Sequence, residues 1–211
     1  MTLFTYSSSP TIRAIQQGLL QFLLLIIMVA IVCLTIFSDV MLFEHGIGEH
    51  SLTERYQQTL LFLVICCFLY AVKIDNGNRH FHVLVAGFFT CMLIREFDGF
   101  FDQLVIHGFW VYPALSVCLI SSVYALQNKQ GTLEGLASFT RHHYFQGITI
   151  ALVIILIFSR LFGIGELWET ILADNYIRLA KNTAEEGVEL LGFSLLFYSV
   201  FGYVRSIHRR I

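Results

Sequence analysis

Six mostly apolar runs, separated by short polar stretches, dominate the sequence. They cover about Gly18–Phe37, Gln57–Ile74, Phe81–Arg95, Gln103–Leu126, Phe145–Ile164 and Gly187–Val204. Several approach or reach the ~20 residues that an α-helix needs to cross a bilayer. Lipid leaves backbone amides no partner outside their own segment, and the runs lack the alternation of barrel strands, so each predicts a transmembrane helix. We expect an all-α, polytopic membrane protein, a six-transmembrane-helix bundle forming one membrane domain over residues 1–211.

Local signals refine the helix boundaries. The S/T-x-x-E spacing of a capping box occurs at Ser51–Glu54 and at Thr183–Glu186, and predicts helix starts before the second and sixth runs. Pro113 lies inside the fourth run, where it predicts a kink. In Gly165–Asn182, apolar residues recur at roughly helical spacing among charges, which predicts a short amphipathic helix lying at the outer interface.

The composition supports membrane insertion. Only 13% of the 211 residues are charged and 56% are hydrophobic, whereas a soluble domain carries about 25% charged residues. The sequence contains no long Lys/Arg run of the kind that binds nucleic acid. The expected partner is therefore the lipid bilayer. A protein partner or a second copy of the chain is a further possibility. The five cysteines lie in apolar runs without metal-ligand spacing, which favours free thiols.

The distribution of basic residues predicts the orientation. With the N-terminus inside, eight of the thirteen Lys and Arg residues fall on the inner side, which favours cytoplasmic N and C termini. A six-span chain with R-E-x-D after the third run (Arg95–Asp98) and E-E-G-x-E-L-x-G opening the sixth (Glu185–Gly192) resembles small bacterial inner-membrane proteins. That resemblance implies a multi-pass protein of the inner (plasma) membrane.

Ionisable residues gather near the predicted outer ends of the runs. The candidates for a ligand-binding site are Arg95, Glu96, His107, Arg160 and Glu189. A charge inside a membrane span costs roughly 2.5–3.5 kcal/mol on insertion scales, so such groups usually face a partner or water. The pattern leaves three alternatives open: ion pairs that hold helices together, a ligand or proton pathway, and a catalytic or metal site.

A metal site would use Glu96, His107 and Glu189, which are ligand types found around zinc or iron. A bound divalent metal is thus a possible cofactor, although the sequence does not favour it. The stretch Glu44–His50 (EHGIGEH) also carries two Glu-His pairs, but its glycines favour a solvated loop. Basic and histidine residues at the opposite edge, such as Arg141–His143 and Arg205–Arg210, are expected to meet anionic lipid headgroups.

These observations predict an integral inner-membrane protein that binds or transports a small ligand, protons or a lipid headgroup through an outer polar pocket, or assists another protein in doing so. A membrane-embedded, metal-dependent hydrolase acting on lipid is one alternative, and a structural subunit of a membrane complex is another. Nothing in the sequence decides whether the chain is an enzyme, because P-loop, H-E-x-x-H and G-x-S-x-G signatures are missing.

Overall fold

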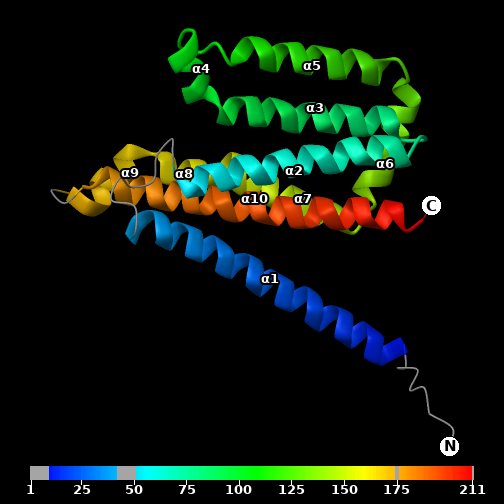
Figure 1. The fold of residues 1–211 in the computed structure, drawn as a ribbon, viewed down its shortest axis with the longest axis horizontal. Helices are drawn as coiled ribbons and strands as arrows, with labels where there is room; N and C mark the ends of the chain where they lie inside the picture. Colours follow the sequence, from blue (N-terminus) through cyan, green and yellow to red (C-terminus); the bar gives the residue numbers. More distant parts are fainter. Residues whose placement is uncertain (1–9, 42–50, 174–175, 211) are drawn as a thin grey trace, which may run out of the picture.

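A computed structural model describes residues 10–41, 51–173 and 176–210, and within these ranges the chain forms helices and no strand (Figure 1). The predicted all-α class is therefore confirmed for this part of the chain. The helices are α1 Pro10–Met41, α2 Leu52–Ile74, α3 Arg79–Glu96, α4 Asp98–Leu104, α5 Val111–Leu126, α6 Lys129–Thr140, α7 Tyr144–Val153, the π-helical turn η1 Ile154–Phe158, α8 Ser159–Gly163, α9 Gly165–Leu172 and α10 Arg178–His208. The predicted loop Glu44–His50 lies outside the described residues.

The long helices run back and forth between two ends of the molecule (Figure 1). One end carries α4 and α9 and is called the α9 end; the other carries α6 and is called the α6 end. α10 is the central helix, since it packs against α1, α2, α7 and α8. α2 packs in turn against α3, and α3 against α5 and α6. α7, η1 and α8 follow one another without a break and form a single rod.

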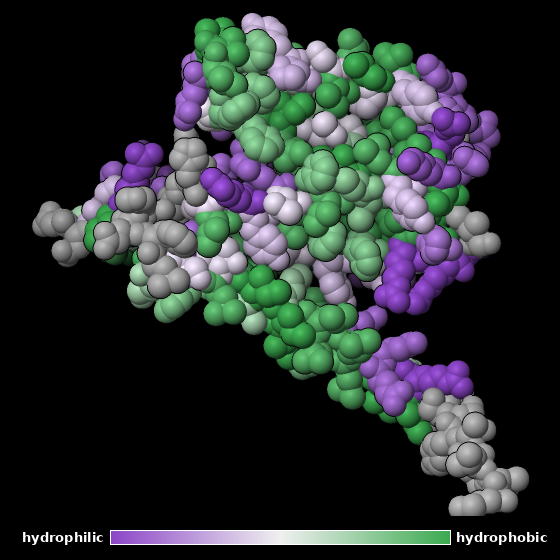
Figure 2. All heavy atoms as spheres, viewed as in Figure 1, coloured by the Kyte–Doolittle hydropathy of each residue, from purple (hydrophilic) through white to green (hydrophobic). Residues whose placement is uncertain are grey.

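Four segments are long and apolar enough to cross a membrane: α1, α2, the rod Tyr144–Gly163 and α10. Much of their apolar surface is exposed; Phe22 and Leu34 on α1, for example, are 64% and 63% exposed. Hydrophobic residues cover the middle of the bundle, and hydrophilic ones gather toward its ends (Figure 2). A surface of this kind fits hydrocarbon and not water, so length and hydropathy identify a multi-pass helical membrane protein.

The third and fourth predicted spans correspond to shorter helices. α3 has 18 residues and includes the charged residues Arg79, Arg95 and Glu96. α5 has 16 residues, about 24 Å at 1.5 Å per residue. α3 nevertheless lies alongside α2, α5 lies alongside α3, and both run between the same two ends (Figure 1).

The prediction of one continuous helix over Gln103–Leu126 was wrong. α4 ends at Leu104, and Gly108 adopts a φ of 81°, a conformation that suits glycine. The Gly108 amide donates to Asp102 Oδ1 over 2.8 Å, which holds the turn between α4 and α5. Pro113 consequently lies in the first turn of α5, where its missing N–H breaks no helical hydrogen bond and no kink is required.

The predicted interfacial helix Gly165–Asn182 is also corrected. α9 ends at Leu172, because the next residue, Ala173, has a φ of 47°. α10 already begins at Arg178, since the following Leu, Ala, Lys and Glu residues are good helix formers. Thr183 therefore lies inside α10 and does not cap it; its hydroxyl donates to the Leu179 carbonyl over 2.7 Å.

α6 was not predicted, because its sequence is mainly polar. Asn128 caps it by accepting the Gly131 amide over 3.0 Å. Gly135 brings α6 against α3, since a Cβ atom there would lie only 2.6 Å from Phe81 Cβ. α6 therefore supports the α6 end of α3.

The junction of α1 and α2 depends on a buried aspartate that the sequence analysis did not single out. Asp39 is 1% exposed. Its carboxylate accepts the Leu52 amide (2.9 Å), the Thr53 amide (2.7 Å) and the Thr53 hydroxyl (2.6 Å). Ser51 accepts the Glu54 amide over 3.2 Å, which confirms the predicted cap. Together these oxygens satisfy amides that the first turn of a helix leaves without partners.

We predict that Asp39→Ala destabilises the protein by about 2–3 kcal/mol, because the buried amide and hydroxyl of Thr53 and the partly buried amide of Leu52 lose a charged acceptor. Ser38→Ala is the matched control, since Ser38 donates only within its own helix, to Leu34. The measurement is thermal unfolding of the purified chain in detergent. Equal stability losses in the two variants would contradict this role for Asp39.

Candidate functional site

A group of polar side chains from different helices meets near the α9 end. This group, called the polar layer, comprises Gln57, Gln58, Glu96, Ser159, Arg160, Glu185, Glu186 and Glu189. Its members come from α2, α3, α8 and α10. The layer therefore joins four helices, and α10 lies more than 100 residues after α2 in the chain.

The strongest contacts of the polar layer link α8 to α10. Arg160 forms an ion pair with Glu189, and its Nη1 lies 3.5 Å from Glu185 Oε1. Glu189 is only 4% exposed. The buried hydroxyl of Ser159 lies 3.1 Å from Glu189 Oε1. The π-helical turn η1 precedes Ser159, and because it widens the helix it alters the face on which the residues after it lie.

A second contact links α10 to α2. The Gln57 amide nitrogen donates to the Glu186 carbonyl (3.0 Å) and to Glu186 Oε2 (3.1 Å). Gln57 is 1% exposed, yet its Oε1 atom has no hydrogen-bond donor within the described chain. The nearby charges that act on Glu186 are the carboxylates of Glu96 and Glu185 and the guanidinium of Arg160. Glu186 thus lies in a carboxylate-rich environment with one cation nearby.

A third contact joins α2 to the end of α3. Gln58 donates to Glu54 Oε1 (3.1 Å) and to the Glu96 carbonyl (3.2 Å). The Glu96 carboxylate pairs with the adjacent Arg95 over 2.9 Å. The Arg95 side chain is 42% exposed, so this pair lies at the edge of the polar layer.

His107 takes no part in these contacts. It lies in the turn between α4 and α5, where its Nδ1 is 2.6 Å from Asp102 Oδ2 and its side chain is 96% exposed. The hydrogen bond from the Gly108 amide lowers the pKa of Asp102, and His107 lowers it further. The structure therefore pairs Arg160 with Glu189, Arg95 with Glu96, and His107 with Asp102. A ligand-binding role for the five residues stays a prediction.

The three candidate metal ligands consequently have different partners. Among the described residues, no three His, Cys, Asp or Glu side chains are grouped so that they share a metal ion. The histidines at the α6 end are likewise engaged elsewhere. His82 is fully buried with Nε2 3.1 Å from Asp75 Oδ2, and His80 stacks on Tyr124 with ring centroids 4.8 Å apart.

The sequence analysis missed Gln57 and Ser159 and assigned Glu186 to a helix cap. A signal for Gln57 was present. It stands at helical spacing with Leu60, Leu61 and Val64, which are all buried, so the heptad pattern places it on the packed face of α2. A polar residue on such a face usually has a hydrogen-bond partner in a neighbouring helix.

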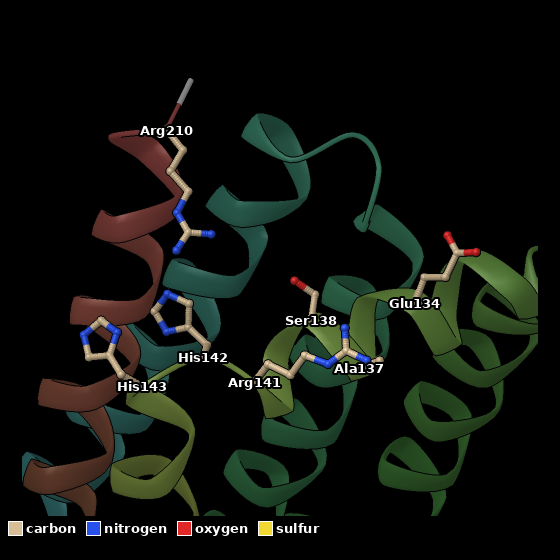
Figure 3. Close-up of a pocket in the computed structure, with 7 residues that line it drawn as sticks. All are labelled: Glu134, Ala137, Ser138, Arg141, His142, His143 and Arg210. Carbon is tan, nitrogen blue, oxygen red and sulfur yellow. The ribbon is translucent and has the colours of Figure 1, made fainter.

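A second candidate site lies at the α6 end. A cavity of about 640 Å³ is lined there by Glu134, Ala137, Ser138, Arg141, His142, His143 and Arg210 (Figure 3). Glu134 is the single acidic residue in this lining. The lining also contains two arginines and two histidines: Arg141, Arg210, His142 and His143. This cavity agrees with the basic edge that the sequence indicates.

Comparison of the chain with models of protein families, with curated proteins and with solved structures finds no match. The function therefore has to be argued from the geometry of these two ends.

We predict that Arg160→Met destabilises the protein by about 2–3 kcal/mol, because Glu189 is left as an unpaired buried charge. The loss stays below the ~3–5 kcal/mol of a fully buried pair, since the Arg160 side chain is 45% exposed. The double variant Arg160→Met/Glu189→Met is expected to regain most of the stability.

Lys181→Met is the control, because Lys181 contacts Glu185 at 3.7 Å at the periphery of the same group. Thermal unfolding in detergent gives the stability of each variant. A double variant less stable than Arg160→Met alone would show that the ion pair does not account for the loss.

A pH dependence is expected from Asp75, in the turn between α2 and α3. Partial burial alone would raise the pKa of Asp75, but hydrogen bonds from Asn78 and His82 outweigh it and lower the pKa. The resulting stabilisation is complete above the unfolded pKa, ~4, and is lost as the pH falls through the folded value. The measurement is the unfolding midpoint as the pH is lowered from about 6. The midpoint should fall less steeply with pH in Asp75→Asn than in the unchanged protein. Glu166→Gln, which changes an exposed carboxylate of α9, is the control and should behave like the unchanged protein.

Proposed function

We propose that the chain is a six-span inner-membrane protein with both termini in the cytoplasm, which binds a proton or a small monovalent cation in its polar layer at the outer face. In this arrangement α3 and α5 serve as the third and fourth spans. The excess of Lys and Arg on the side of the termini supports the orientation.

The observation that carries the binding function is the pair Gln57–Glu186. Gln57 donates its amide to Glu186, but its buried Oε1 has no donor. A buried acceptor without a donor costs about 1–3 kcal/mol. A proton carried by water, or a cation that prefers oxygen ligands, would offset this cost between Gln57 Oε1 and the Glu186 carboxylate. The excess of carboxylates around Glu186 attracts the same class of ligand.

A structural role is the second candidate, because most of the predicted site residues already have protein partners. Arg160, Glu185, Glu189, Arg95 and Glu96 all form ion pairs. The pairs of Arg160 with Glu185 and Glu189 hold α8 on α10 whether or not a ligand binds. The alternative of a metal-dependent lipid hydrolase draws no support from the described residues, since Glu96, His107 and Glu189 belong to separate contacts.

Thermal unfolding of the purified full chain tests the proposal. The probes are Na⁺, K⁺ and NH₄⁺ as chlorides at constant ionic strength, together with a titration of the unfolding midpoint against pH. A bound cation at about one hundred times its Kd should raise the midpoint by roughly 5–10 °C. A proton as the ligand would instead add a pH dependence of the midpoint that requires Glu186. Either response should disappear in Glu186→Gln and Gln57→Leu, and persist in the exposed α9 control Glu169→Gln.

The variant Gln57→Leu separates the two functions. If the polar layer is only structural, Gln57→Leu destabilises the protein, because Glu186 loses the donor to its carboxylate, and neither the unchanged protein nor the variant responds to any cation or to protons. That outcome would overturn the binding function. A response that Glu169→Gln abolishes equally would also overturn it, because it would not depend on the polar layer.

A further inference from the structure

A groove lies between α1, α7 and α10 at the α6 end. It has a volume of about 640 Å³. Leu20 and Leu24 of α1 and Phe201 of α10 form apolar parts of its lining. Figure 1 shows why space exists there, because α1 diverges from α10 toward its N-terminus. Only Val32 and Asp39 of α1 are buried, and both belong to its other half.

The mouth of the groove is strongly basic. His143, Arg205, Arg209 and Arg210 line it together with the hydroxyl-bearing Ser206. Within the described chain, none of these three arginines forms an ion pair with a carboxylate. Three exposed guanidinium groups without acidic partners at the end of an apolar groove leave a large positive charge unbalanced.

The neighbouring cavity extends this charge. It shares His143 and Arg210 with the groove and adds Arg141. Figure 3 shows the side chains of Arg210, His142 and His143 close together, with Glu134 at the far edge. Burial lowers the pKa of His142, and the charges of His143 and Arg210 lower it further. The part of this lowering that comes from His143 and Arg210 reflects the positive charge around the cavity.

His142 lines the cavity and contacts Ser206, which lines the groove. Its Nδ1 accepts the Tyr144 amide over 3.4 Å, and its Nε2 lies 2.8 Å from Ser206 Oγ. The Ser206 hydroxyl donates to the Tyr203 carbonyl over 2.6 Å, so Nε2 carries the proton and donates to Ser206. These contacts hold Ser206 and the start of α7 in place beside the arginines.

We propose that this groove binds one anionic phospholipid, with its phosphodiester at His143, Arg205, Arg209 and Arg210 and one acyl chain between α1 and α10. Guanidinium groups suit phosphate because they present several N–H donors in a planar array. The apolar walls distinguish a lipid from a soluble anion: Leu20 and Leu24 are 56% and 45% exposed and line the same groove as the arginines. The site is separate from the polar layer and requires only that the chain lies in a membrane.

Lipid titration of the purified full chain in detergent, followed by native mass spectrometry, tests this site. The probes are phosphatidylglycerol and phosphatidylcholine with identical acyl chains. We expect one phosphatidylglycerol to bind in preference to phosphatidylcholine. Removing one arginine charge near a membrane surface weakens binding of an anionic lipid about fivefold, so Arg209→Gln/Arg210→Gln should weaken phosphatidylglycerol binding roughly 25-fold and leave phosphatidylcholine unchanged.

The matched control is Lys73→Gln/Lys129→Gln, which removes two exposed basic residues from the same end but outside the groove. Its phosphatidylglycerol affinity should change less than about twofold. An equal loss in the two double variants would overturn the site, because a diffuse basic surface would then explain binding. Displacement of the lipid by glycerol phosphate at equal concentration would also overturn it, since the groove would then bind a soluble anion.

Discussion

The bundle depends on one constraint: polar groups on helices with apolar, exposed flanks must find their partners inside the protein. The junction of α1 and α2 meets this constraint through Asp39, whose carboxylate accepts amides at the start of α2. The polar layer meets it through Arg160, which lies between the carboxylates of Glu185 and Glu189. Both contacts join different helices, so satisfying polar groups also determines which helices pack together.

α10 shows how this constraint shapes the whole molecule. Its middle and last turns bury Leu190, Phe193, Leu196 and Val200. Its first turns carry the charges that contact α2 and α8. Close packing is also required on this helix, because a Cβ atom at Gly192 would lie 2.6 Å from Ile155 of η1. One helix therefore holds the apolar core and the polar layer in a fixed relation.

The two ends of the bundle differ in the sign of their unbalanced charge. At the α9 end, carboxylates outnumber the cations that meet them, and Gln57 keeps a buried acceptor without a donor. At the α6 end, arginines outnumber the acidic residues that line the cavities. Opposite charge excess at opposite ends suits a protein that meets different ligands on the two sides of a membrane.

The sequence by itself determined the helical class, the four segments long and apolar enough to cross a membrane (α1, α2, Tyr144–Gly163 and α10), and the Ser51 cap. These features follow from local hydropathy and from hydrogen bonds between near neighbours in the chain. The sequence also marked Arg160 and Glu189 as charges in apolar surroundings, because position alone makes such charges costly.

Only the tertiary structure decided which charges meet. Asp39 and Leu52 lie 13 residues apart, and Gln57 and Glu186 lie 129 apart, so no local pattern shows that they touch. The break before α5 depends on a turn closed by Asp102 and Gly108, which hydropathy does not register. Hydropathy did not predict α6 either, because its sequence is mainly polar. This helix is recognised by its packing on α3. Long-range packing thus separated Glu96, His107 and Glu189, which the sequence had grouped by predicted depth alone.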